Sequence, residues 1–156
     1  MSNYIQFLRQ YVGHQPLLQC AASVIVENDE GQILLQQRTD NHCWGYAGGA
    51  IELKETIEEA AKRELYEETG IIADELELFS VFSGPDFYYQ YPNQDEVYNI
   101  DIVFVCKKYH GELKADPSEV EALAFFDLKT LPEPISPPVA IPLQKYIAYK
   151  TQLSNP

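Results

Sequence analysis

The residues best suited to chemistry are glutamates that gather within residues 49–71, GAIELKETIEEAAKRELYEETGI. On a helix with about 100° per residue, Glu64 and Glu68 fall within about 20° of the apolar stripe that starts at Ile57. Glu67 lies beside them, at about −80° on the same scale. Burying an unpaired carboxylate costs several kcal/mol, and like charges four residues apart repel each other. A divalent cation such as Mg²⁺, which binds carboxylate oxygens and keeps water for a phosphate substrate, would remove this conflict.

A charged, solvated helix face is the simpler interpretation, and it explains part of the pattern. Arg63 can pair with Glu59 or with Glu67 at helical spacing. This interpretation leaves Glu64 and Glu68 unexplained, because both lie on the inner edge of the helix. Helix geometry alone therefore leaves a metal site and a solvated face as open alternatives.

The helix that carries these glutamates has clear start and stop signals. Thr56 is a suitable N-cap, and Glu59 follows three residues later, as a capping box requires. Gly70 stands where a helix C-cap is expected. These signals predict a helix over residues 56–69.

The elements around this helix predict the fold class. Strands are expected at 20–27 and 33–38, joined by a turn into a hairpin, with a loop at 39–49. The remaining expected elements are a helix at 3–12, strands at 76–83, 97–108 and 122–126, and a helix at 143–151. An aromatic loop, residues 84–92, separates two of these strands. Because helices and strands do not alternate regularly, the pattern favours an α/β fold with a mixed β-sheet covered by helices.

Length and composition fit one domain over residues 1–156, with an N-terminal helical arm at 1–13. Apolar residues make up 46% of the chain, too many for a disordered acidic segment. The net charge of −13 argues against binding to nucleic acid or to an anionic membrane. The longest apolar run, residues 102–106, is far too short to span a membrane.

The cysteines and the N-terminus predict a cytoplasmic protein. Cys20, Cys43 and Cys106 are scattered and form no CxxC pair, which is typical of reduced thiols rather than a disulfide framework or a zinc site. The first residues lack the basic start and apolar stretch of a secretory signal.

Nine residues within 49–71 form a spaced pattern: Gly49, Glu55, Arg63, Glu64, Leu65, Glu67, Glu68, Gly70 and Ile71. They resemble the Nudix box, G-x5-E-x7-R-E-U-x-E-E-x-G-U, in which U is aliphatic. The chain is therefore identified as a member of the Nudix (MutT-type) hydrolase family, with a resemblance over residues 20–135. Ala47 replaces a proline that is common before the box, and Lys54 replaces a frequent glycine, but neither change removes a ligand.

The resemblance implies an α/β/α sandwich around a mixed sheet, and a hydrolase that needs Mg²⁺ or Mn²⁺. By the same resemblance, Glu64, Glu67 and Glu68 would bind the metal together with the backbone carbonyl of Gly49. Arg63 would hold a box glutamate in place by a charge-assisted hydrogen bond.

The resemblance also implies catalytic roles. Glu55 would support the site or contact the metal through water. The general base differs between members of this family. Here Glu64 is the first choice, and Glu119 or Glu121 outside the box are alternatives, although a solvated loop explains these two residues better.

Substrate contacts are expected outside the box. Arg38, at the end of its strand, can meet a phosphate, although a surface salt bridge competes with this role. Tyr88 belongs to the aromatic loop and can stack on a base, although core packing or a dimer interface explains the loop equally well.

The resemblance implies a pyrophosphohydrolase that acts on a nucleoside diphosphate linked to another group, or on a (d)NTP. A Nudix domain that binds a nucleotide without turnover, as a regulator, is the alternative, and the intact box favours the enzyme. A structural domain without a ligand would leave Glu64 and Glu68 unexplained. The expected partner is a small-molecule nucleotide, and a homodimer is common in the family.

Overall fold

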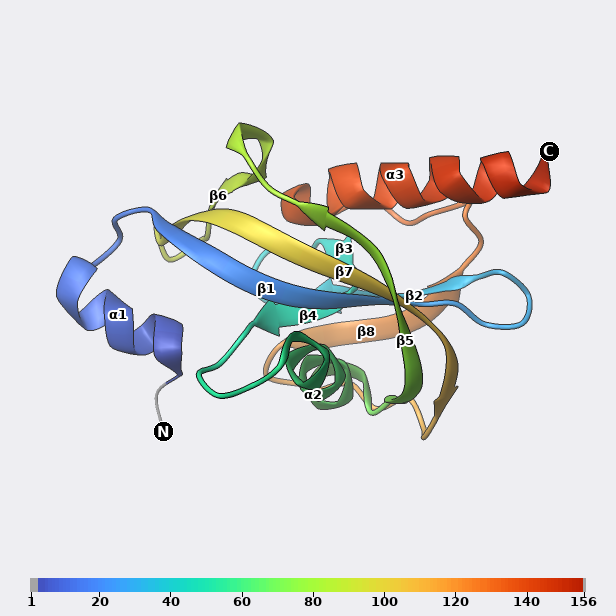
Figure 1. Cartoon of the computed structure of the whole chain (residues 1–156), viewed down its shortest axis with the longest axis horizontal. Coiled ribbons are helices and arrows are strands. Elements are labelled where there is room, and N and C mark those ends of the chain that lie inside the picture. Colours follow the sequence, from blue (N-terminus) through green and yellow to red (C-terminus); the bar gives the residue numbers. More distant parts are fainter. Residues whose placement is uncertain (1–2, 156) are drawn as a thin grey trace.

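The chain folds into layers, with helices on both sides of β-strands. The computed structural model describes residues 3–155. Helix α2 (Ile57–Thr69) and helix α3 (Pro137–Ser154) lie on opposite sides of the strands, and α1 (Tyr4–Val12) lies at one end (Figure 1). This arrangement confirms the predicted α/β fold. The predicted domain 1–156 and arm 1–13 also include residues 1, 2 and 156, which lie outside the described part of the chain.

The strands form two sheets. Their bounds are β1 (Leu17–Val26), β2 (Ile33–Arg38), β3 (Trp44–Gly45), β4 (Ala47–Ala50), β5 (Ile72–Phe82), β6 (Tyr88–Gln90), β7 (Glu96–His110) and β8 (Val120–Phe126). The larger sheet has the order β4-β1-β7-β5, with β6 paired to β7, and the smaller has the order β3-β2-β8. Within the larger sheet, β1 and β7 run parallel, with Ala21 opposite Asp101, and the β1–β4, β5–β7 and β6–β7 pairs are antiparallel, so this sheet is mixed, as predicted.

The predicted hairpin between residues 20–27 and 33–38 is wrong. Strands β1 and β2 form as expected, but they belong to different sheets and are joined by a single bridge between Glu27 and Ile33. The two strands diverge after the turn because β1 pairs with β4 and β7, whereas β2 pairs with β3 and β8.

The predicted loop at 39–49 also contains two short strands, β3 and β4. Strand β4 has the sequence AGGA and pairs antiparallel with β1, with Gly48 opposite Ser23. A Cβ atom at Gly48 would collide with the Ser23 side chain, so glycine permits this close pairing. Glycine has low strand propensity, which hides this edge strand from sequence patterns.

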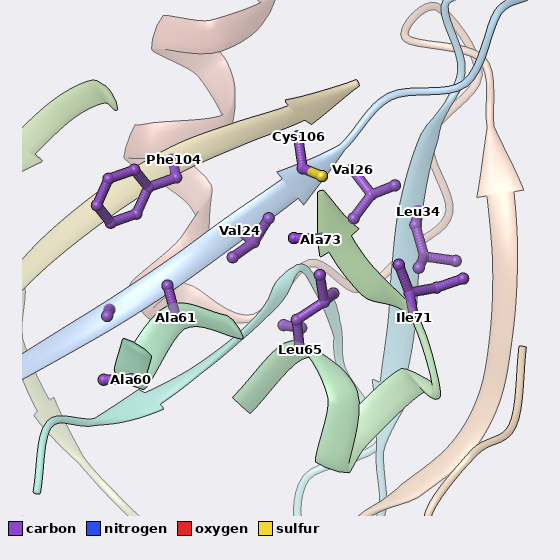
Figure 2. Packing of buried hydrophobic residues seen from close by; sticks show 12 residues of the cluster. Val24, Val26, Leu34, Ala60, Ala61, Leu65, Ile71, Ala73, Phe104 and Cys106 are labelled. Atoms are coloured by element: carbon purple, nitrogen blue, oxygen red, sulfur yellow. The ribbon is translucent and has the colours of Figure 1, made fainter. Parts of the chain in front are cut away.

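Helix α2 forms as predicted. The Thr56 side chain accepts a hydrogen bond from the Glu59 amide at 3.1 Å, and the Thr56 amide donates to Glu59 at 2.8 Å. Gly70 ends the helix in the left-handed conformation, with φ of 78°. The inner face, which includes Leu65, packs on the even-numbered side chains of β1 and β7 (Figure 2). This packing fixes which side of α2 faces the sheet.

Helix α3 covers the opposite face and is longer than the predicted 143–151. Its Leu143 and Tyr146 pack against Ile25 and Val103. In residues 3–155 no helix has the length and apolar character needed to cross a membrane.

We expect a buried carboxylate to anchor α3. Glu27, 7% exposed, accepts hydrogen bonds from the Tyr146 hydroxyl and, at 2.9 Å, from Lys150 Nζ. Burial alone would raise the pKa of Glu27, but these bonds outweigh it and lower the pKa. Lys150→Met should therefore lower the free energy of unfolding by about 3 kcal/mol, because it leaves a buried charge unpaired. The loss should be measurable by urea unfolding at pH 7 and should shrink as pH falls and Glu27 becomes protonated. Lys145→Met, on an exposed position of the same helix, is the control, and an equal effect of both variants would contradict the anchor.

Candidate active site

The carboxylate of Glu68 lies beneath β4. It is 4% exposed and accepts hydrogen bonds from the Gly48 amide at 3.1 Å and from the side-chain amide of Gln36. Burial raises the pKa of Glu68 to about 8, and the nearby charge of Glu64 adds to this rise. The two hydrogen bonds hold the group in place but do not neutralise its charge.

The carboxylate of Glu64 rests against Gly49. A Cβ atom at Gly49 would lie 2.5 Å from the carboxyl carbon of Glu64, so only glycine leaves room for this side chain. Burial raises the pKa of Glu64, although the ion pair with Arg63 partly offsets the effect. The two inner glutamates are thus both held close to the edge strand β4.

This close packing leads to a prediction about Gly49. We expect Gly49→Ala to displace the Glu64 carboxylate and lower kcat by about 10²-fold, because small misplacements of reacting groups have effects of this size. The melting temperature should change little, since β4 is an edge strand. Glu64→Asp in the Gly49→Ala background shortens the acid and should recover part of the rate. Full activity of Gly49→Ala would contradict the assigned contact.

Arg63 connects the carboxylates of the helix with the loop before it. It bonds both oxygens of Glu55, contacts Glu64 at 2.7 Å, and donates to the backbone carbonyl of Ala50 at 3.2 Å. These bonds lower the pKa of Glu55, the Arg63 side chain being the main cause. Arg63 therefore fixes the loop and one inner glutamate at once, while its contact with Glu67 is long, at 3.4 Å.

A polar cavity of about 370 Å³ opens over Glu64 and Glu68. Arg38 lines it and holds a two-point ion pair with Asp40, at 2.8 and 2.7 Å. Glu119, from the loop before β8, lines the same cavity, and its charge raises the pKa of both inner glutamates. The cavity thus brings together carboxylates and one arginine.

Other residues predicted for the site lie farther out. Glu67 is exposed and faces an outer groove that α1 also lines. Glu121 pairs with His42 at 2.8 Å and does not line the cavity over Glu64 and Glu68. Tyr88 is exposed, donates a hydrogen bond from its hydroxyl to Glu96, and does not line this cavity either.

The comparisons with known proteins agree with the sequence motif. The NUDIX domain model matches residues 17–146. The chain belongs to the Nudix family. It is 40% identical over 116 residues to the ADP-ribose pyrophosphatase of Methanocaldococcus jannaschii. The match covers 72% of this chain and 64% of that protein. The chain is 36% identical over 111 residues to a putative 8-oxo-dGTP diphosphatase of Bacillus subtilis, covering 71% and 68%. The match thus spans less than two thirds of the archaeal relative.

Solved structures show the same Nudix fold. The crystal structure of the MutT NUDIX hydrolase from Burkholderia pseudomallei superposes with a TM-score of 0.70. The two chains are 30% identical, and the match covers 83% of this chain and 97% of the other. The predicted Nudix architecture is therefore confirmed.

The residues of this Nudix site fit a hard divalent cation in their chemistry. Glu64 and Glu68 offer carboxylate oxygens to the same cavity, and the side-chain oxygen of Gln36 next to Glu68 is buried without a hydrogen-bond partner among residues 3–155. In the same part of the chain, no three His, Cys, Asp or Glu side chains converge as a ready-made metal cluster. Oxygen donors are therefore present, but their side chains are not yet gathered around one point.

Several contacts of the Nudix site were missed by sequence reasoning. Gln36 and Gly48 bond Glu68, yet each stands in a stretch with no motif of its own. Tyr89 and Tyr91, rather than Tyr88, line the narrow slot beside the cavity. The aromatic loop was the only available signal, and it does not tell which ring turns inward.

Proposed function

We propose that this protein is a divalent-metal-dependent pyrophosphohydrolase that cleaves a nucleoside diphosphate linked to another group, or a (d)NTP. One observation supports this most strongly: Glu64 and Glu68 line the same cavity, where burial raises the pKa of both, and of the two only Glu64 has an ion pair, with Arg63, among residues 3–155. Two ionised carboxylates in such a site destabilise the fold unless a further cation joins them.

Glu64, Glu67 and Glu68, with the carbonyl of Gly49, are the proposed ligands of Mg²⁺ or Mn²⁺. The bound cation lowers the pKa of its water and offsets the negative charge of the phosphates. Glu67 is the most exposed of these groups and must turn inward from its outer position to join the other two. Carboxylate ligands favour Mg²⁺ or Mn²⁺ over softer metals.

Glu64 is the proposed general base. Its carboxylate lines the cavity next to Glu68, where it can take a proton from a water molecule. Glu55 and Arg63 act as positioning residues, since Arg63 bonds both Glu55 and Glu64. Glu119 remains an alternative base because it lines the same cavity, and the ion pair of Glu121 with His42 disfavours Glu121.

The shape of the site supports a substrate with a group on each side of the pyrophosphate. A narrow slot extends from the cavity on one side, and an outer groove lined by Tyr4, Phe7 and Leu53 reaches Glu64 on the other. Arg38 is placed to meet a phosphate between them. A relative named ADP-ribose pyrophosphatase adds support for this substrate class.

A panel assay tests the proposal. Product release from ADP-ribose, dinucleoside polyphosphates and (d)NTPs is measured with Mg²⁺ or Mn²⁺ and with EDTA. We expect metal-dependent turnover of one class, lost in Glu68→Gln. Binding of a nucleotide without turnover under these conditions would favour the regulatory Nudix domain instead.

Three further expectations belong to this proposal. We propose one Nudix hydrolase domain over residues 1–156. A cytoplasmic location suits the thiols of Cys20, Cys43 and Cys106, which are free in the structure. A homodimer stays a prediction, which sedimentation velocity would test.

A further inference from the structure

A narrow slot leads from the carboxylate cavity to the far side of β4. The slot and the cavity share part of their lining: Gln19, Gln36, Arg38, Gly48, Gly49 and Tyr91. Ser136, which precedes α3, and Val139 in its first turn form part of the opposite wall. A molecule with its phosphates in the cavity can therefore extend its remaining part into the slot.

Asp101 on β7 lies at the inner end of this slot. It is 7% exposed and accepts hydrogen bonds from the Ser23 hydroxyl at 2.6 Å and from the Tyr46 hydroxyl at 3.0 Å. Among residues 3–155, no basic side chain forms an ion pair with it. A carboxylate has about four acceptor positions, so these two hydrogen bonds leave about two of them free.

Asn99 stands two residues before Asp101, on the same face of β7. Its side-chain oxygen accepts a hydrogen bond from Gln19 at 3.4 Å, and its side-chain nitrogen has no hydrogen-bond partner in the described part of the chain. The inner end of the slot therefore offers a carboxyl acceptor and an amide donor side by side.

The walls of the slot suit a flat ring. One wall of the slot contains Gly45, Gly48 and Gly49, which have no side chains. This wall lies close to α3, since a Cβ atom at Gly45 would lie 2.9 Å from Val139. Tyr89 and Tyr91 line the slot with their rings 4.9 Å apart and nearly perpendicular. A planar heteroaromatic base fits such walls better than a puckered sugar.

We propose that the slot binds the nucleobase of the substrate and that Asp101 selects a base with an exocyclic amine. The amine donates to Asp101, while Asn99 donates to the neighbouring acceptor of the ring. A base that carries a carbonyl in place of the amine brings its oxygen against the carboxylate, and the phosphates held in the cavity prevent the ring from sliding to avoid it. The inference rests on the proposed nucleotide hydrolysis and adds the identity of the base.

Binding of nucleoside monophosphates tests this inference without turnover. Dissociation constants are measured by calorimetry in Mg²⁺ for AMP, GMP and IMP, and for CMP and UMP, none of which has a pyrophosphate bond to cleave. We expect at least one amino base to bind about 10- to 100-fold more tightly than its amine-free counterpart, as for a hydrogen bond to a charged group. Similar affinities for all five, or no binding at all, would overturn the assignment.

Asp101→Asn separates this residue from the rest of the slot. The variant has nearly the same shape but offers an amide, so the preference for the amino base should disappear. Asp86→Asn, the same change at an exposed position, should keep the preference. An unchanged preference in Asp101→Asn would overturn the role of Asp101. Because these nucleotides have no pyrophosphate bond, the assay involves no reaction, and a protein that binds selectively but does not hydrolyse would refute the proposed function and leave this inference standing.

Discussion

Glu68→Gln is expected to abolish turnover and, at the same time, to stabilise the metal-free protein. The amide cannot serve as an anionic metal ligand, so kcat should fall by about 10³-fold, equivalent to ~4 kcal/mol of transition-state stabilisation. The glutamine can still accept from Gly48, and its amide can donate to the unpartnered oxygen of Gln36. The neutral side chain therefore suits this buried position better than a carboxylate does.

The stabilising effect should depend on pH. In the folded protein the pKa of Glu68 is raised from 4.5 to about 8, so the ionised carboxylate opposes folding. This cost is absent below pH 4.5 and complete above pH 8, and wild-type stability falls between them. At pH 9 the variant should gain about 2–4 kcal/mol in the free energy of unfolding, and the gain should vanish near pH 4.

Urea unfolding in EDTA across this pH range checks the expectation. Glu58→Gln removes the same charge from an exposed position of α2 and should show no such gain. Adding Mg²⁺ should raise the melting temperature of the wild type but not of Glu68→Gln. A Glu68→Gln variant less stable than the wild type at pH 9 would show that the carboxylate is not an unbalanced charge.

Glu64→Gln is expected to lower kcat by about 10³- to 10⁴-fold, because it removes the proposed base together with a metal ligand. In the wild type, the kcat–pH profile should show an acid limb, because the base must be ionised to take a proton from water. Residual activity of Glu64→Gln should lose this limb.

Two variants outside the box serve as comparison. Glu119→Gln should lower kcat less than tenfold, because Glu119 only adds its charge to the cavity. Glu121→Gln should leave kcat unchanged, because its carboxylate pairs with His42. If Glu119→Gln caused the larger loss and removed the acid limb, Glu119 would be the base instead of Glu64.

The sequence predicted helix α2 well because the signals that set its ends are local. The Thr56–Glu59 capping box and Gly70 set its ends, and helical spacing alone places Glu68 on the buried face. The same spacing starts from Ile57, which is in fact 39% exposed, because the first turn of α2 extends beyond the sheet.

Features that depend on distant partners escaped prediction. Strand β4 forms because Gly48 can approach Ser23 on β1, and no pattern within AGGA reveals that pairing. Asp101 stands in an apolar strand sequence, and only the parallel register of β1 and β7 places it near Ser23. Long-range pairing of this kind decides which polar residues share a slot, so sequence patterns could not find this part of the site.

Hydrolysis in ¹⁸O-labelled water tests the central claim most directly. The protein is incubated with ADP-ribose and with (d)NTPs in the presence of Mg²⁺, and the products are weighed by mass spectrometry. Attack of water on a pyrophosphate phosphorus predicts two phosphorylated products, of which one carries a single ¹⁸O, with no reaction in EDTA or in Glu68→Gln. Bound but intact nucleotide, or label incorporation that persists in EDTA, would contradict a metal-dependent pyrophosphohydrolase.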